Sequence, residues 1–186
     1  MKKLKATLAF LLCSTLFSYL SAQTLYKSTN AEVSFFSKTP LENIDGKTNT
    51  ATALIGVEKK EVIFFITNNS FQFPNKLMQE HFNEKYMESE KFPYSTFKGI
   101  IQDSIDLKVA GVYNVKVKGK LTIHGVEQER TINGTVTVSN GKIVVVSDFK
   151  VKVADHKIEI PTVVTAKIAE ELDVKIVTSL VPKVKN

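Results

Sequence analysis

Apolar and polar residues alternate along most of the chain after Ala31, as in a β-strand with one buried and one solvent-facing side. The clearest case is GVYNVKVKGKLTIHG, residues 111–125. Its apolar positions, which alternate with polar residues including three lysines, are Tyr113, Val115, Val117, Leu121 and Ile123. The pattern predicts a long strand with these five side chains inside.

Further strands follow and precede this one. A turn in HGVEQ leads to a strand over 130–138, and Asn140-Gly141, a strong hairpin signal, leads to another over 142–153. Weaker alternation predicts strands over 32–37, 47–56, 61–67, 94–101 and 171–180. The chain therefore predicts about eight antiparallel strands in a meander.

Two helical segments interrupt the strands, from Asn75 to about Met87 and from Thr162 to Glu170. A sheet of eight strands with one apolar face hides its edges by closing into a barrel, which is wide enough for a small ligand. We predict an all-β fold, a single eight-stranded antiparallel barrel with one or two short helices.

The first 22 residues have a different pattern: a lysine-rich start, an apolar run from Leu8 to Leu20, and a small-residue end at Ser21-Ala22. This is typical of a secretory signal peptide. The run is shorter than the roughly 20 apolar residues that a membrane-spanning helix needs. We predict a signal peptide over 1–22, one domain over 23–186, and export to the periplasm or beyond.

Charge and cysteine content change with that cleavage. Of 25 basic residues, Lys2, Lys3 and Lys5 leave with the signal, so 22 remain against 19 acidic ones and the net charge falls from +6 to +3. The single cysteine, Cys13, leaves too, which excludes a disulfide or thiol chemistry in the exported chain. A nucleic-acid partner is not expected, because it needs a stronger basic patch.

Lysines form stripes on the polar faces of two predicted strands: Lys116, Lys118, Lys120, Lys150 and Lys152. Such a stripe is a solvated face that discourages edge pairing, or it attracts an anionic membrane surface. The sequence leaves both readings open, and it leaves a homodimer open as well.

The helical stretch LMQEHFNEKYM, residues 77–87, supports two interpretations. Glu80, His81 and Glu84 could contribute to a metal or catalytic site, but no third partner at a recognised spacing completes one. Met78, Phe82 and Tyr86, each four residues apart, form an apolar stripe. We favour the stripe as a lid over a barrel mouth, and we predict no metal.

Three stretches of the chain are similar to a known family: residues 70–99, 119–138 and 149–176. The most specific parts are Phe92-Pro93 with STFKG (95–99), and LTIHGV (121–126). In this order and spacing they resemble the YceI-like family of exported bacterial proteins. The resemblance implies a lipocalin-like barrel whose apolar cavity holds a long-chain amphiphile, a polyisoprenoid lipid or a quinone.

Such a ligand has few polar groups, so its site should be a set of inward apolar side chains. The candidates are Phe35, Phe64, Phe73, Met78, Phe82, Tyr86, Phe97, Tyr113, Val115, Val117, Phe149 and Val151. Each of them equally fits a role as core filling. His124 lies in a turn, where it holds the backbone or approaches a ligand head group.

These observations predict a binding protein without enzymatic activity or a cofactor, which holds a hydrophobic small molecule for transport, storage or stress protection in the cell envelope. No G-x-S-x-G nucleophile motif is present. Two alternatives stay open: an enzyme acting on a lipid-like substrate, and a solidly packed barrel that serves as an interaction or stress module.

Overall fold

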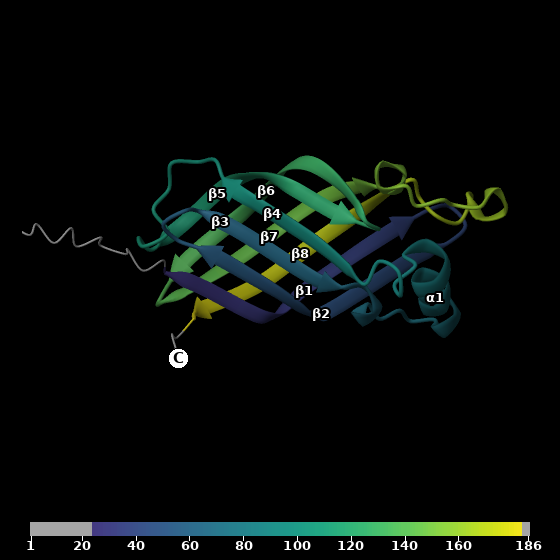
Figure 1. Ribbon diagram of the computed structural model, residues 1–186, viewed down its shortest axis with the longest axis horizontal. Helices are drawn as coiled ribbons and strands as arrows, with labels where there is room; N and C mark the ends of the chain where they lie inside the picture. Colours follow the sequence, from purple (N-terminus) through teal and green to yellow (C-terminus); the bar gives the residue numbers. More distant parts are fainter. Residues whose placement is uncertain (1–23, 184–186) are drawn as a thin grey trace, which may run out of the picture.

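The computed structural model describes residues 24–183 as a closed barrel of eight strands (Figure 1). Each strand pairs antiparallel with its neighbours in sequence, and the last strand closes on the first. The strands are β1 (Leu25–Lys38), β2 (Asn43–Gly56), β3 (Glu61–Thr67), β4 (Tyr94–Ile101), β5 (Gly111–Ile123), β6 (Val126–Ser139), β7 (Lys142–Lys152) and β8 (Glu171–Pro182). The predicted all-β barrel is confirmed, whereas the signal peptide over 1–22 lies outside the described residues.

The turn between β5 and β6 is tighter than HGVEQ predicts. His124 (φ 51°) and Gly125 (φ 71°) are both left-handed, so Ile123 pairs directly with Val126. This two-residue turn matches the twist of the flanking strands. β6 therefore begins at Val126 and not at residue 130, and the predicted Asn140-Gly141 hairpin has the same left-handed pair of residues.

The first predicted helical segment is confirmed, and the second is not. The first contains α1 (Lys76–His81), where the Asn75 side chain accepts a hydrogen bond from the Leu77 amide at 2.8 Å, followed by a π-helical turn over Phe82–Tyr86. The predicted helix over 162–170 is wrong, since only Thr162–Val164 form a 3₁₀ turn. β-Branched residues in succession there disfavour a helix. No helix within residues 24–183 has the length and apolarity of a membrane span.

The two ends of the barrel differ (Figure 1). At one end, which we call the mouth, lie α1, the β1–β2 loop, the β5–β6 turn and the segment 153–170. At the far end, Leu107 from the β4–β5 loop packs with Ile143 and Leu180, none of them more than 2% exposed. The far end is therefore a packed core.

Candidate functional site

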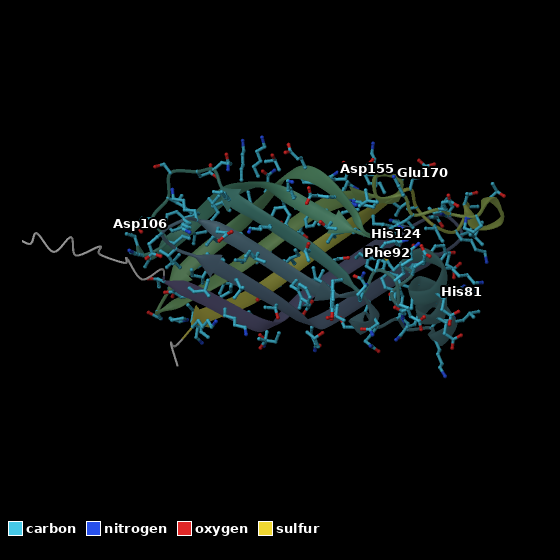
Figure 2. The ribbon with its side chains drawn as sticks, in the orientation of Figure 1. His81, Phe92, Asp106, His124, Asp155 and Glu170 are labelled. Carbon is cyan, nitrogen blue, oxygen red and sulfur yellow. The ribbon has the colours of Figure 1, made fainter. Side chains whose placement is uncertain are left out.

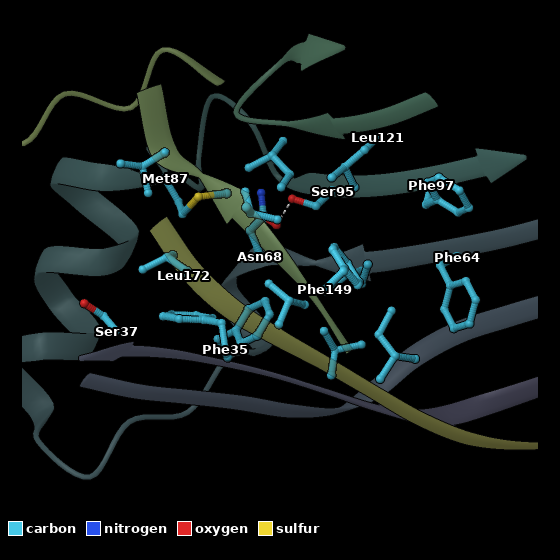
Figure 3. A pocket seen from close by; sticks show the side chains of 18 of the residues that line it. Phe35, Ser37, Phe64, Asn68, Met87, Ser95, Phe97, Leu121, Phe149 and Leu172 are labelled. Carbon is cyan, nitrogen blue, oxygen red and sulfur yellow. Dashed lines mark hydrogen bonds between the residues drawn. The ribbon is translucent and has the colours of Figure 1, made fainter. Parts of the chain in front are cut away.

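The barrel encloses a cavity of about 410 Å³, which is within the range of small-molecule sites. Ile55 and Ile101 border it toward the far end, and α1, Glu42 and residues 158–168 surround it at the mouth. The wall is made of inward side chains of the strands, because alternate residues of every strand face the interior. Figure 3 shows aromatic and aliphatic side chains converging on this space.

Most of the sequence candidates come together here. Eleven line the cavity: Phe35, Phe64, Phe73, Met78, Phe82, Tyr86, Phe97, Val115, Val117, Phe149 and Val151. Tyr113 does not, because its ring lies against Gly111 and its hydroxyl donates to the Val109 carbonyl at 3.0 Å. A direct contact between these side chains and a ligand stays a prediction.

The helical segment is attached to the barrel by aromatic rings. Phe82 stacks on Phe35 of β1, with centroids 5.6 Å apart, and packs against Phe71 at 5.5 Å and Phe73 at 5.0 Å. Such aromatic pairs stabilise beyond the area they bury. Gly46 makes room for the cluster, because a Cβ there would lie 2.5 Å from the Phe35 ring.

The two faces of the helical segment separate as the stripe hypothesis expects. Met78, Phe82 and Tyr86 line the cavity, whereas Glu80 and Glu84 are exposed. His81 lies on the cavity side and not with the acids. Within residues 24–183, no group of three or more His, Cys, Asp or Glu side chains is arranged to hold a metal ion.

Polar side chains in the cavity wall are bonded within the protein. Asn68, which is fully buried, donates from Nδ2 to the Phe92 carbonyl at 2.6 Å and accepts at Oδ1 from the Ser95 hydroxyl at 2.8 Å (Figure 3). Ser37 Oγ accepts from the Ala169 amide at 2.8 Å. These bonds tie loops to strands, and they leave the interior apolar.

Charged and phenolic groups gather at the rim. Glu42 forms an ion pair with Lys167 at 3.8 Å across the mouth. Burial raises the pKa of the Tyr86 phenol, and the negative charge of Glu42 adds to that rise. The rim therefore provides hydrogen-bonding groups next to an apolar interior.

A second polar cluster lies outside the cavity lining. His124 Nε2 lies 2.8 Å from a Glu88 carboxylate oxygen, and His124 Nδ1 lies 3.3 Å from the His156 carbonyl oxygen. The hydrogen bond to His124 lowers the pKa of Glu88. The His124 ring also packs edge-on against Phe92 at 4.4 Å, near the mouth (Figure 2). The cluster connects the β5–β6 turn to the chain that follows the helical segment.

Sequence reasoning missed several wall residues. The alternation of inward and outward residues could have identified Ile66, Val136 and Ile176, which continue the inward rows of their strands. Phe71 and the rim residues Ile158, Ile160 and Ile168 lie in irregular backbone, where no period marks the inward face. Only the three-dimensional path of these segments brings them to the mouth.

A closed eight-stranded meander around an apolar cavity defines a lipocalin-like single-domain barrel. The chain belongs to the YceI-like family, whose domain model matches residues 26–180. None of the curated proteins compared with the chain matches it.

Solved structures share the fold. A polyisoprenoid-binding domain from Saccharophagus degradans, implicated in plant cell wall breakdown, superposes with a TM-score of 0.74 at 17% identity, covering 87% of this chain and 99% of its own. BcnA from Burkholderia cenocepacia superposes with a TM-score of 0.67 at 19% sequence identity, covering 80% of this chain and 95% of BcnA. The YceI protein of Campylobacter jejuni superposes with a TM-score of 0.61 at 17% sequence identity, covering 75% of this chain and 85% of that protein. At these identities the similarity establishes the fold.

Proposed function

We propose that this protein binds a single-chain hydrophobic or amphiphilic lipid, of the isoprenoid class, in the barrel cavity. The observation that carries the proposal is an interior space of about 410 Å³ with an apolar wall. The relative from Saccharophagus degradans is described as polyisoprenoid-binding, which supports the choice of ligand class.

Apolar burial alone supplies enough free energy for such binding. At about 25 cal/mol per Å², a chain that loses ~400 Å² of exposed surface gains on the order of 10 kcal/mol before ordering costs are subtracted. A preformed wall keeps those costs low, because the protein does not have to order itself around the ligand. Discrimination among ligands would then come from shape and from the few polar groups nearby.

We propose a binding role without enzymatic activity. Asn68, Ser95 and Ser37, which border the cavity, are hydrogen-bonded to one another or to the backbone. The His124–Glu88 pair, which has the chemistry of a general base, is not part of the cavity lining. These bonds, and the position of the His124–Glu88 pair outside the lining, support binding over catalysis.

We propose that the protein is exported and that it exchanges its ligand with membranes in the cell envelope. The predicted signal peptide and the lysine stripes support this. Lys120 is paired with Glu127 at 2.6 Å and Lys150 with Asp173 at 2.8 Å, which lowers the basic character of both stripes. Attraction to anionic lipid should accordingly be modest and should disappear at high salt.

Titration with an environment-sensitive apolar dye such as Nile red tests the binding function. We expect saturable fluorescence enhancement that geranylgeraniol, a prenyl alcohol, reverses by competition. Dye that binds without saturation, or that the prenyl alcohol does not displace, would contradict a defined apolar site.

A further inference from the structure

The barrel wall is incomplete between β6 and β7. Their backbone ladder has five pairs, from Ser139–Lys142 to Thr135–Val146. Beyond Thr135, the rest of β6 has no ladder to β7, although β5 pairs with β6 along its whole length as far as Ile123–Val126. β6 and β7 therefore part midway along the barrel and stay apart toward the mouth. We call this gap, between residues 126–134 and 147–156, the seam.

Side chains hold the seam together in place of the ladder. Each bond runs from a side chain on one side of the seam to a backbone carbonyl on the other: Ser147 Oγ to Asn133 (2.6 Å), Arg130 to Lys150 (2.5 Å), Gln128 to Asp155 (2.7 Å), and His156 Nδ1 to Val126 (3.0 Å). A bond of this kind opens by rotation of one side chain, whereas a ladder opens only with displacement of the strand. The seam can thus open with fewer backbone hydrogen bonds to break than the continuous β5–β6 ladder.

Where the ladder ends, the cavity and a recess on the outer surface share wall residues. Val115, Asn133, Gly134 and Ser147 border both. A Cβ built on Gly134 would lie 3.5 Å from the Ser147 Cβ. These four residues therefore separate the apolar interior from the outer recess.

Polar side chains border the recess, together with Val115 and Val146. Its outward side chains carry two carboxylates, one ammonium group, two amides and one hydroxyl: Asp103, Asp148, Lys116, Asn114, Asn133 and Thr135. In the part of the chain that the structure describes, the Asn133 amide makes no hydrogen bond, and Asn133 is exposed. Two carboxylates against one ammonium disfavour an anionic ligand group, whereas amides and hydroxyls suit an uncharged one.

We propose that the seam is a second opening of the cavity, in which the polar end of an uncharged single-chain amphiphile lies. The apolar chain stays inside, the Ser147–Asn133 bond opens, and the ligand's hydroxyl group accepts from the freed Ser147 hydroxyl and donates to the freed Asn133 backbone carbonyl. This inference rests on the proposed lipid-binding function and adds to it a polar subsite and a chemical class, a prenyl alcohol or similar neutral amphiphile.

A disulfide across the seam tests the inference. The chain from residue 23 onward contains no cysteine, and the 3.5 Å Cβ separation at Gly134 and Ser147 fits disulfide geometry. We expect the oxidised Gly134→Cys/Ser147→Cys protein to bind geranylgeraniol about tenfold more weakly than the reduced protein, in which the seam can still part and a thiol stands in for the Ser147 hydroxyl as a weak donor and acceptor. Equal affinity for geranylgeraniol in the two redox states would overturn the proposal.

Two controls make the outcome specific. A cysteine pair at Lys118 and Thr131, opposite each other on the continuous β5–β6 ladder, should show no redox effect on binding. If the seam disulfide prevents folding, Ser147→Ala replaces it, because it removes the hydroxyl of the proposed subsite, with Ser139→Ala as the matched exposed serine on β6. We expect weaker geranylgeraniol binding in the first variant only, and equal binding in both would overturn the proposal. Loss of all dye and alcohol binding in the wild type would instead contradict the lipid-binding function itself.

Discussion

The ring of Phe82, in the π-helical turn after α1, stacks on the ring of Phe35 in β1, with planes inclined by 21°. This contact joins the helical segment at the mouth directly to the barrel wall. Both rings also line the cavity, so the same side chains close the mouth and border the interior. A change at Phe82 should therefore affect ligand retention before it affects the barrel.

We expect Phe82→Asp to release a bound apolar dye several-fold faster than the wild type, because it places a carboxylate among three aromatic rings. Glu84→Ala, on the exposed face of the same turn, should leave the rate unchanged. Stopped-flow dissociation of Nile red into an excess of lipid vesicles measures both. Equal or reversed effects would indicate that the acidic face matters more than the apolar stripe.

A second prediction concerns the cavity volume. Val117→Trp adds a large ring to the cavity wall and should abolish dye binding, while the remaining space limits the cost of overpacking to about 1–3 kcal/mol. Lys118→Trp, the exposed neighbour on β5, should bind as the wild type does. Dye titration and urea unfolding of both variants are the measurements. Undiminished binding by Val117→Trp would place the ligand elsewhere.

The Asn68 hydrogen bonds should stabilise the fold and not the ligand. Asn68→Leu leaves the Phe92 carbonyl and the Ser95 hydroxyl without partners, which should lower the free energy of unfolding by about 2 kcal/mol or more. Asn114→Leu, at an exposed position, should change it by less than about 0.5 kcal/mol. Urea denaturation compares the two, and a neutral Asn68→Leu would show that the buried amide is dispensable.

His156 should make stability depend on pH. Burial lowers the pKa of its ring below the ordinary value of about 6.5, an effect that the nearby Arg130 strengthens and Asp155 and the bond to the Val126 carbonyl oppose. The unfolded chain then takes up a proton before the folded one does. The free energy of unfolding should be highest above pH about 6.5 and should decrease as the pH falls toward the folded pKa.

His156→Gln keeps a side-chain amide donor for the Val126 carbonyl and does not titrate. We expect the free energy of unfolding of this variant to depend less on pH than that of the wild type between about pH 7 and about pH 5. Urea denaturation at each pH measures it. The same pH slope in variant and wild type would show that the burial of His156 does not contribute.

Alternation along the sequence predicted the strands because each has one face in the barrel and one in water. Val115 and Val117 face the cavity for that reason. The same alternation wrongly predicted that Tyr113 lines the cavity. Alternation shows which face of the sheet a residue lies on, but it does not show the position of the residue along the barrel axis. The β5–β6 turn was predicted too long because the left-handed conformation of His124 is not encoded by a strong dipeptide signal.

The seam could not be predicted from the sequence at all. Residues 126–134 carry apolar side chains only at Val126 and Ile132, yet β6 is fully paired with β5 along them. Whether the other edge also pairs depends on the path of β7, which diverges beyond Val146. Long-range strand spacing of this kind arises from the closure of the whole barrel.

The central claim is that the cavity holds a lipid in the protein's own host. Native mass spectrometry of protein purified from that host, followed by organic extraction and identification of the released compound, tests it most directly. We expect a bound mass that is lost on mild activation, matches a single-chain isoprenoid amphiphile in the extract, and is absent from Val117→Trp. Protein from the same host that carries no lipid, or that carries the same lipid in Val117→Trp, would contradict the account.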